Sequence, residues 1–228
     1  MKLDLESDIE VAAAAVDCSA SEIWRLPFHL NGPWWLEPLL PRHGEALAQQ
    51  YRNPDTAAMT GLPEIGEELD ARGWIAMRRR ESPATYAFMH ARFGFVGYGD
   101  LFLHRDESYL CMWMGEDFRG RGWGKVLVHH LGALARQAGL SVVWSSAYEH
   151  NTPSLRSMAG AGFRTLDLRA LPPDEERQFV YLPLRPWLAA EARAGMVDFC
   201  DRTQTGVRFE GIASHDLPST ISSEEIAP

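Results

Sequence analysis

The clearest pattern in the chain is a helical stripe of apolar positions near its middle. These positions recur every three or four residues, as the buried face of a helix requires: Leu127, Leu131, Leu134 and Ala138. A short apolar run from Tyr109 to Met114 precedes the stripe, and another from Ser141 to Ala147 follows it. Gly139 stands where a helix C-cap is expected. The pattern predicts a strand, a loop, a helix and a second strand in succession.

Alternation and helical spacing predict further elements on both sides of this unit. Strands are expected at Trp34 to Leu40, Thr85 to His90, Gly94 to Leu103, Phe163 to Leu168 and Gln178 to Leu182. Helices are expected at Arg42 to Tyr51, at Pro63 to Arg72, from an N-cap at Thr152 to Gly162, and at Trp187 to Ala194. Asn53-Pro-Asp55 is expected to end the first of these helices. The order of elements indicates an antiparallel meander that leads into a βαβ unit.

The pattern also suggests how the chain divides. Residues 1–30 are expected to form an N-terminal extension, with a short helix at Val11 to Ala15 and strand-like alternation of Trp24, Leu26 and Phe28. This arm could lie over the core or across the partner in a homodimer. Residues 31–186 are expected to form one domain. Residues 187–228 are expected to give a C-terminal helix and, from about residue 201, a polar mobile tail.

Composition narrows the class of protein. The chain has 228 residues, 46% of them apolar, which is enough for one domain with a sizeable core. Its formal net charge of −9 argues against a binder of nucleic acid or of anionic membranes. Three cysteines without a C-x-x-C pair indicate neither a disulfide framework nor a metal site, which favours the cytoplasm. We identify no signal peptide and no membrane span.

The loop before the central helix carries the chemistry. It reads Arg119-Gly-Arg-Gly-Trp-Gly124, with Lys125 following. Glycines allow unusual backbone angles and close approach to a ligand. The first N–H groups of a helix lack partners within it, and the helix dipole favours an anion there. Hydrogen bonds to a charged group contribute about 1.5–3 kcal/mol each, so a few of them would hold a diphosphate.

Several sites share this layout. A dinucleotide site needs G-x-G-x-x-G and an acidic residue at the end of the next strand, where this chain has Ser145-Ser-Ala147. A nucleoside-triphosphate loop needs G-x-x-x-x-G-K-[ST], which is absent. A coenzyme A site and an ordinary glycine-rich turn remain.

Three motifs bring a family into view. Arg119-x-x-Gly122-x-Gly124 resembles the R/Q-x-x-G-x-G/A signature of the GNAT superfamily of acyl-CoA-dependent N-acyltransferases. Asn151-Thr-Pro-Ser154 followed by Gly160-Ala-Gly-Phe163 resembles the family's N…S…GF segment, and Phe95 to Asp100 resembles its strand before the cofactor strand. The resemblance covers Trp35 to Leu184. It implies an α+β fold whose mostly antiparallel sheet is splayed between two central parallel strands, with helices on both faces.

The resemblance also implies roles for particular residues. The backbone of Met112, Trp113 and Met114 would pair with the pantetheine arm of acetyl-CoA or another acyl-CoA. The loop would hold the pyrophosphate, and Asn151 and Ser154 would contact the cofactor from the other side of the splay. The residues expected to bind the cofactor are therefore Met112, Trp113, Met114, Arg119, Gly120, Arg121, Gly122, Trp123, Gly124, Lys125, Asn151 and Ser154. No metal is expected.

The catalytic positions depart from the family. Many members carry a tyrosine seven residues after the asparagine, as the acid for the leaving thiolate, and this chain has Met158 there. Some carry a glutamate five residues before it, where this chain has Ser146. Nearby candidates are Tyr148 as acid and Glu149 as base. Behind them stand His150, Asp100 and Tyr98, and a water chain could also remove the proton.

The implied activity is transfer of an acetyl or other short acyl group to a primary amine, by direct attack in a ternary complex. The acceptor would be a small molecule or a protein N-terminus, and Trp34, Trp35, Tyr51 and Trp74 could line an aromatic pocket for it. The alternative is a catalytically degenerate module that binds acyl-CoA as a sensor. A nicotinamide-dependent oxidoreductase is disfavoured by the missing ribose carboxylate.

Overall fold

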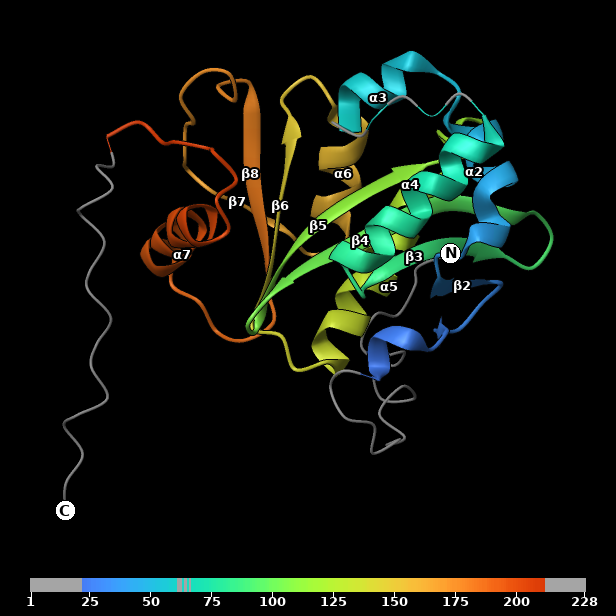
Figure 1. The fold of residues 1–228 in the computed structure, drawn as a ribbon. Coiled ribbons are helices and arrows are strands. Elements are labelled where there is room, and N and C mark those ends of the chain that lie inside the picture. Colours follow the sequence, from blue (N-terminus) through green and yellow to red (C-terminus); the bar gives the residue numbers. More distant parts are fainter. Residues whose placement is uncertain (1–21, 61–62, 64, 66, 212–228) are drawn as a thin grey trace.

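The protein is built on one eight-stranded sheet, seen in a computed structural model that describes residues 22–60, 63, 65 and 67–211 (Figure 1). The strands lie in the order β1-β2-β3-β4-β5-β6-β8-β7. Their bounds are β1 Phe28–His29, β2 Trp34–Pro38, β3 Thr85–His90, β4 Gly94–His104, β5 Glu107–Met114, β6 Val142–Tyr148, β7 Arg164–Thr165 and β8 Arg177–Pro183. Every neighbouring pair is antiparallel except β5 and β6, which are parallel.

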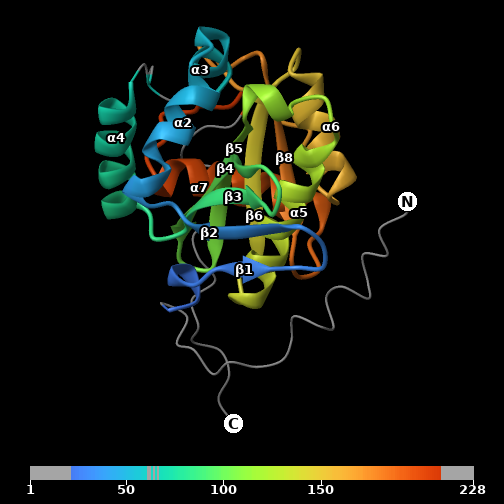
Figure 2. The ribbon, with the colours of Figure 1, turned by 90° about the vertical axis from the view of Figure 1, so that its right-hand side faces the viewer.

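Helices cover both faces of the sheet. Figure 2 shows α2, α4 and α7 on one side and α5 and α6 on the other. Their bounds are α2 Gly44–Tyr51, α3 Pro54–Thr60, α4 Glu68–Glu81, α5 Trp123–Gln137, α6 Thr152–Gly160 and α7 Ala189–Arg202. None of the described helices is long and apolar enough to cross a bilayer. The mixed sheet and its two helical layers confirm the fold class expected from the sequence.

The helical stripe of α5 forms the centre of the largest hydrophobic cluster. Leu127, Leu131 and Leu134 are completely buried against the sheet, as their spacing predicted. Burying a leucine side chain contributes about 1.5–3 kcal/mol. Gly139 follows the helix with φ +76°, a left-handed conformation that suits a glycine C-cap.

The region after α2 differs from the expectation. Helix α2 ends at Tyr51, as expected, but a further helix that the pattern did not indicate, α3, starts at Pro54. Proline is tolerated in the first turn of a helix, where its missing N–H would have no partner. Asn53 Oδ1 also accepts a hydrogen bond from the Asp55 N–H at 2.9 Å, as an N-cap side chain does. The next helix, α4, begins at Glu68 instead of Pro63 and runs to Glu81.

Two further boundaries are corrected on the other side of the sheet. The N-cap of α6 is Asn151 and not Thr152, because the Asn151 side chain accepts a hydrogen bond from the Ser154 N–H at 3.3 Å. The expected strand from Phe163 to Leu168 is shorter in the structure, where β7 spans Arg164 and Thr165 and the Leu166 N–H donates to the Phe179 carbonyl of β8 at 2.9 Å. Leu166 and Leu168 are both buried, as their alternation predicted.

The two ends of the described chain pack more firmly than expected. Trp24 lies in a short 3-10 turn, Ile23–Arg25, and not in a strand, and it is buried together with Phe28 in the α5 cluster. At the other end α7 continues to Arg202, and Phe209 beyond it is buried and bridges to Ala170. Residues up to 211 therefore do not form a free tail. The helix expected at Val11 to Ala15 lies outside the described residues.

Candidate functional site

The two parallel strands separate soon after they meet. Residues Glu107, Ser108 and Tyr109 of β5 pair with Val142, Val143 and Trp144 of β6, and no later residues of the two strands pair. Just past these pairs, the Ser145 Oγ donates a hydrogen bond to the Leu110 carbonyl at 2.9 Å. Beyond it the strands diverge (Figure 1). A cleft of about 830 Å³ lies in the opening, lined by both strands, the glycine-rich loop, α3 and the start of α6.

The open edge of β5 can accept another extended chain. From Leu110 to Met114 this strand stays paired with β4 on one side but has no strand partner on the side of β6. Unpaired N–H and C=O groups at a sheet edge recruit an added strand. Five residues at the rise of a β-strand span about 17 Å. The unpaired edge of β5 can therefore bind an extended substrate arm that has amide groups of its own.

The glycine-rich loop lies at the open end of the cleft, beyond the end of β5. Gly120 and Gly122 have φ values of +71° and +76°, in the left-handed region that favours glycine. A Cβ at either position would point into open space, so the backbone there is free to be approached. Gly122 is the N-cap of α5, and no side chain caps its first N–H groups. These groups and the helix dipole suit a phosphate.

Gly124 serves a different purpose. A Cβ at Gly124 would lie 2.8 Å from Ser157 Oγ and 3.7 Å from a carbon of Met114. The glycine therefore lets α5 lie close to α6 at the mouth of the cleft.

Most of the residues expected to bind the cofactor do line the cleft. They are Met112, Trp113, Met114, Arg119, Gly120, Gly122, Trp123, Gly124, Asn151 and Ser154. Arg121 and Lys125 are not among the lining residues. The Arg121 guanidinium lies over the Trp123 ring at 5.4 Å, and a Cβ at Gly160 would meet the Lys125 stem at 3.1 Å.

The side chain of Arg119 is engaged within the protein. Its Nε donates to the Met114 carbonyl at 3.2 Å, and its Nη2 donates to Thr56 Oγ1 at 2.6 Å. This arginine therefore joins the end of β5 to α3, and the backbone of its loop, more than its charge, faces the cleft.

The two catalytic candidates are placed differently. Tyr148 lines the cleft, and its ring stacks on His150 with centroids 5.4 Å apart. Glu149 is exposed, is absent from the lining, and uses its N–H to bond the Glu176 carbonyl. The structure brings Tyr148 to the site and does not bring Glu149.

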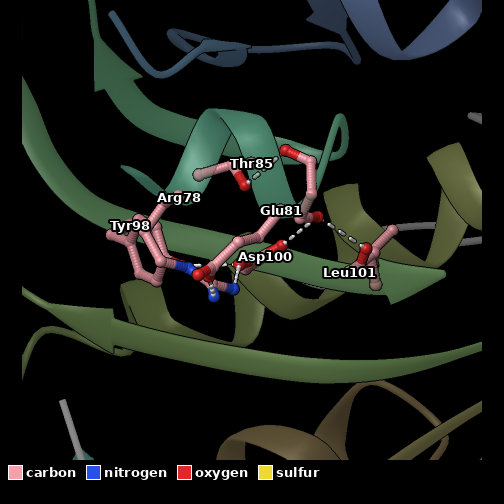
Figure 3. A network of polar contacts seen from close by, with 7 residues as sticks. Arg78, Glu81, Thr85, Tyr98, Asp100 and Leu101 are labelled. Atoms are coloured by element: carbon pink, nitrogen blue, oxygen red, sulfur yellow. Dashed lines mark hydrogen bonds and ion pairs between the residues drawn. The ribbon is translucent and has the colours of Figure 1, made fainter. Parts of the chain in front are cut away.

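Asp100 and Tyr98 belong to a separate buried network (Figure 3). The Asp100 carboxylate accepts hydrogen bonds from Arg78 Nη2, Ser82 Oγ and Tyr98 Oη, and it is fully buried. Burial and this carboxylate raise the pKa of Tyr98 well above its usual value. Neither residue lines the cleft, so both serve to anchor α4 on β4.

The aromatic residues expected to line an acceptor pocket do not gather in one. Trp74 packs on Tyr98, Trp35 stacks on His29, and Trp34 contacts His90. Tyr51 is buried against Trp113. None of the four lines the cleft between β5 and β6.

At the closed end of the cleft the structure adds Tyr109 and Arg177, which the sequence did not indicate. Tyr109 Oη and Ser146 Oγ are 2.6 Å apart across the junction of the two strands, and Arg177 Nη1 donates to Ser146 Oγ at 3.3 Å. Burial raises the pKa of Tyr109 to about 12, and that of the neighbouring Cys111 to about 12. Met158 also lines the cleft and is buried. Only the register of β6 against β8 brings Arg177 here, so no local motif could have indicated it.

Comparison with known structures places the fold. The chain matches an acetyltransferase of the GNAT family from Bacillus anthracis with a TM-score of 0.61 at 12% identity, covering 70% of this chain and 99% of that one. It matches ribosomal-protein-S5-alanine acetyltransferase from Vibrio fischeri (0.59, 11%, 72% and 99%) and spermidine N-acetyltransferase from Vibrio cholerae in complex with CoA and spermine (0.57, 13%, 68% and 97%). No curated protein matches by sequence.

A sequence-family comparison agrees with the fold. The model of the acetyltransferase (GNAT) family matches residues 47–163, which are 117 of the 228 residues in the chain. This segment contains the splayed junction, the glycine-rich loop, and α5 and α6. The chain therefore belongs to the GNAT acetyltransferase family.

Proposed function

We propose that this protein transfers an acetyl or other short acyl group from acyl-CoA to a primary amine, by direct attack of the amine in a ternary complex. The observation that carries the proposal is the unpaired edge of β5 ending at the open N-terminus of α5. That combination suits a ligand with a diphosphate at one end and an extended amide-bearing arm, which describes coenzyme A. The cysteine pattern supports the cytoplasm as its location.

The roles within the site follow from position. The loop from Arg119 to Gly124 would hold the pyrophosphate through backbone N–H groups, and the edge from Met112 to Met114 would pair with the arm. Asn151 and Ser154 lie across the cleft at the start of α6. Acyl-CoA would supply the activated thioester, and the protein must bring an amine to it in the neutral, deprotonated form.

The acceptor amine must lose a proton before it can attack the thioester. An alkylamine such as that of lysine has a pKa near 10.4, so its neutral form at pH 7 costs about 4.6 kcal/mol. The described lining holds one carboxylate, Asp55, which is exposed on α3. We assign deprotonation to water in the cleft, and we keep Tyr148 as the acid that protonates the departing thiolate. Positioning of the two reactants supplies much of the remaining rate.

The acceptor is an amine on a small molecule or a protein N-terminus. The solved structures that share the fold include a spermidine acetyltransferase and an acetyltransferase of a ribosomal protein, so the fold serves both sizes of acceptor.

Two measurements test the proposal together. Calorimetric titration with acetyl-CoA should show saturable binding, and NADH should show none. Release of free CoA should then appear with at least one member of a panel of primary amines. Absence of acetyl-CoA binding would refute the proposal at its first step.

A second candidate is a sensor that binds acyl-CoA without turning it over. It is favoured by Met158, which occupies the family's usual acid position and is buried at the cleft wall. This candidate predicts tight acetyl-CoA binding with no CoA release from any amine.

A further inference from the structure

The closed end of the cleft carries an arginine, Arg177, for which the binding of coenzyme A gives no role. Arg177 is the first residue of β8 and stands opposite Tyr148 of β6 in the sheet. Its guanidinium lies under the Tyr148 ring at 4.9 Å and reaches Ser146 Oγ, so it points back toward the junction of β5 and β6. The cleft lining includes all four residues of this cluster: Tyr109, Ser146, Tyr148 and Arg177.

The cluster faces the side of the sheet away from the glycine-rich loop and its helix. Side chains alternate along a strand, and Tyr109 stacks on Phe199 of α7, with ring centroids 6.3 Å apart. Trp144 and Phe179, two residues before Ser146 and two after Arg177, pack in the same α7 cluster. The intervening Leu110 and Ala147 pack instead in the α5 cluster. Arg177 therefore lies on the α7 face of the sheet, away from the glycine-rich loop that would hold the pyrophosphate of the cofactor.

Arg177 has hydrogen-bonding capacity to spare. A guanidinium offers five N–H donors. Among the described residues it makes one hydrogen bond, to Ser146 at 3.3 Å, and one ion pair, from Nε to Asp174 at 2.8 Å. The Nε–H is not directed at that carboxylate, and no other acceptor meets it. The side chain is 29% exposed, so it is held in place and still reachable from the cleft.

The charged residues of the cleft lining also favour an acceptor with an anionic group. Its described residues include three arginines, Arg119, Arg156 and Arg177, and one carboxylate, Asp55. Arg119 is bonded to Thr56 and Met114, and Arg156 is on α6 at the cofactor side. Polycationic acceptors need several carboxylates around them, which this lining lacks. An acceptor with an anionic group finds a planar, two-pronged partner in Arg177.

We propose that the acceptor is a small amine that also carries a carboxylate, as amino acids do, and that Arg177 binds this carboxylate while the amine faces the thioester. The inference rests on the proposed function and narrows its substrate class. Tyr109 and Ser146 act as positioning residues, because their hydroxyl pair and the Tyr148 ring fix the direction of the guanidinium.

Matched pairs of acceptors test the inference on the full-length protein. Each pair is an amino acid and the amine it yields on loss of its carboxylate: phenylalanine and phenethylamine, leucine and 3-methylbutylamine, methionine and 3-(methylthio)propylamine. CoA release is measured for each at saturating acetyl-CoA. We expect kcat/KM to favour the acid over its partner amine. Arg177→Gln should lower kcat/KM for the acids by about 10- to 100-fold, the range for one charged hydrogen-bonding partner.

The variants are chosen so that folding failures are visible. Arg177→Gln should leave acetyl-CoA binding within about twofold of the wild type, and it should lower kcat/KM for the acids by more than it lowers kcat/KM for the amines. Arg177→Lys keeps the positive charge but cannot bind a carboxylate with two N–H groups at once, so it should retain part of the preference for acids over amines. Arg156→Gln, an exposed arginine at the cofactor side, should leave the ratio of acid to amine unchanged. Equal turnover of acids and amines, or an equal loss for both in Arg177→Gln, would overturn the inference.

Failure of the proposed function gives a different result. If acetyl-CoA binds and none of the six compounds releases CoA, saturation-transfer NMR on the CoA-loaded protein shows whether the acids bind without being acetylated. Binding of the acids that Arg177→Gln abolishes would support the carboxylate site without catalysis. Binding of neither acids nor amines would refute the carboxylate site. Loss of acetyl-CoA binding itself would refute the proposed function.

Discussion

Ser145 Oγ donates to the Leu110 carbonyl at 2.9 Å, one residue beyond the last backbone pair between β5 and β6. Ser145 is buried, and this bond marks the point from which the two strands separate. A side chain thus takes over at the place where a backbone donor would have continued the ladder.

Replacing Ser145 by alanine should therefore destabilise the fold. The Leu110 carbonyl would lose its partner, and a buried group left without one costs about 1–3 kcal/mol. Chemical denaturation should show this loss as a lower midpoint with an unchanged slope. Thr165→Ala, at an exposed site on β7, is the control and should change stability by less than about 0.5 kcal/mol. An unchanged midpoint in Ser145→Ala would show that the bond is dispensable.

Gly122→Ala should separate ligand binding from stability. Gly122 and Gly139 stand at opposite ends of α5, share a φ of +76° and have open space at the Cβ position. Alanine at either site should cost about 1–2 kcal/mol of stability, because the left-handed conformation is unfavourable for it. Only Gly122→Ala adds a methyl group over the first N–H groups of α5. We expect it to weaken acetyl-CoA binding by tenfold or more in calorimetry.

Gly139→Ala completes that comparison. It should lower the melting temperature by a similar amount and leave acetyl-CoA affinity unchanged. Equal affinities in the two variants would mean that the loop does not contact the cofactor.

The packing of α5 on α6 can be tested with a double-mutant cycle. A Cβ at position 124 would press on Ser157 Oγ, which is held by a 2.9 Å bond to the Pro153 carbonyl. Gly124→Ala should therefore destabilise by about 1–3 kcal/mol, as overpacking does. Ser157→Ala removes the oxygen, so the double variant should recover most of the loss. Additive losses in the cycle would contradict this account.

Tyr148→Phe tests the acid of the proposed reaction. Removal of a general acid lowers kcat by about 10²- to 10⁴-fold, and acetyl-CoA affinity should stay within twofold. Met158→Leu is the matched control, because methionine cannot donate a proton and leucine fills a similar volume. The ratio of the two kcat values, measured with one acceptor, gives the result. If Tyr148→Phe keeps the wild-type kcat, another group or water protonates the thiolate.

His130 should make stability depend on pH. It is buried in α5 between Phe28 and Phe88, and burial lowers its pKa to about 4, with His129 and His29 adding to the effect. The unfolded chain, with a pKa near 6.5, binds the proton first, so the free energy of unfolding falls as pH drops from about 6.5 to 4. The loss should reach about 3 kcal/mol.

Denaturation at pH 7 and at pH 4.5 measures this contribution. His130→Phe should reduce the difference in unfolding free energy between the two pH values, and His150→Gln, at an exposed site, should not. The same pH dependence in His130→Phe as in the wild type would assign it to other groups.

Sequence reasoning predicted the centre of this protein well and its edges poorly. Helix α5 is predicted by the spacing of Leu127, Leu131 and Leu134, because a buried helical face requires an apolar residue every three or four positions. The glycines of the loop can be recognised equally well, since a positive φ such as that of Gly122 strongly favours glycine. The sequence does not indicate α3, because a proline such as Pro54 can both end one helix and begin the next. Arg177 could not be found, because its place in the cleft depends on strand pairing between distant segments.

The packing of α7 bears on what counts as the folding unit. The family match spans residues 47–163, yet Trp144 of β6 lies against Phe199 of α7, and Gly195 allows the helix to approach that tryptophan closely. A chain cut after Pro186 would leave Trp144, Phe179 and Tyr181 uncovered on one face of the sheet. Such an apolar surface promotes aggregation. Work on isolated fragments should therefore keep the chain at least to Gly211, well past the limits that family resemblance suggests.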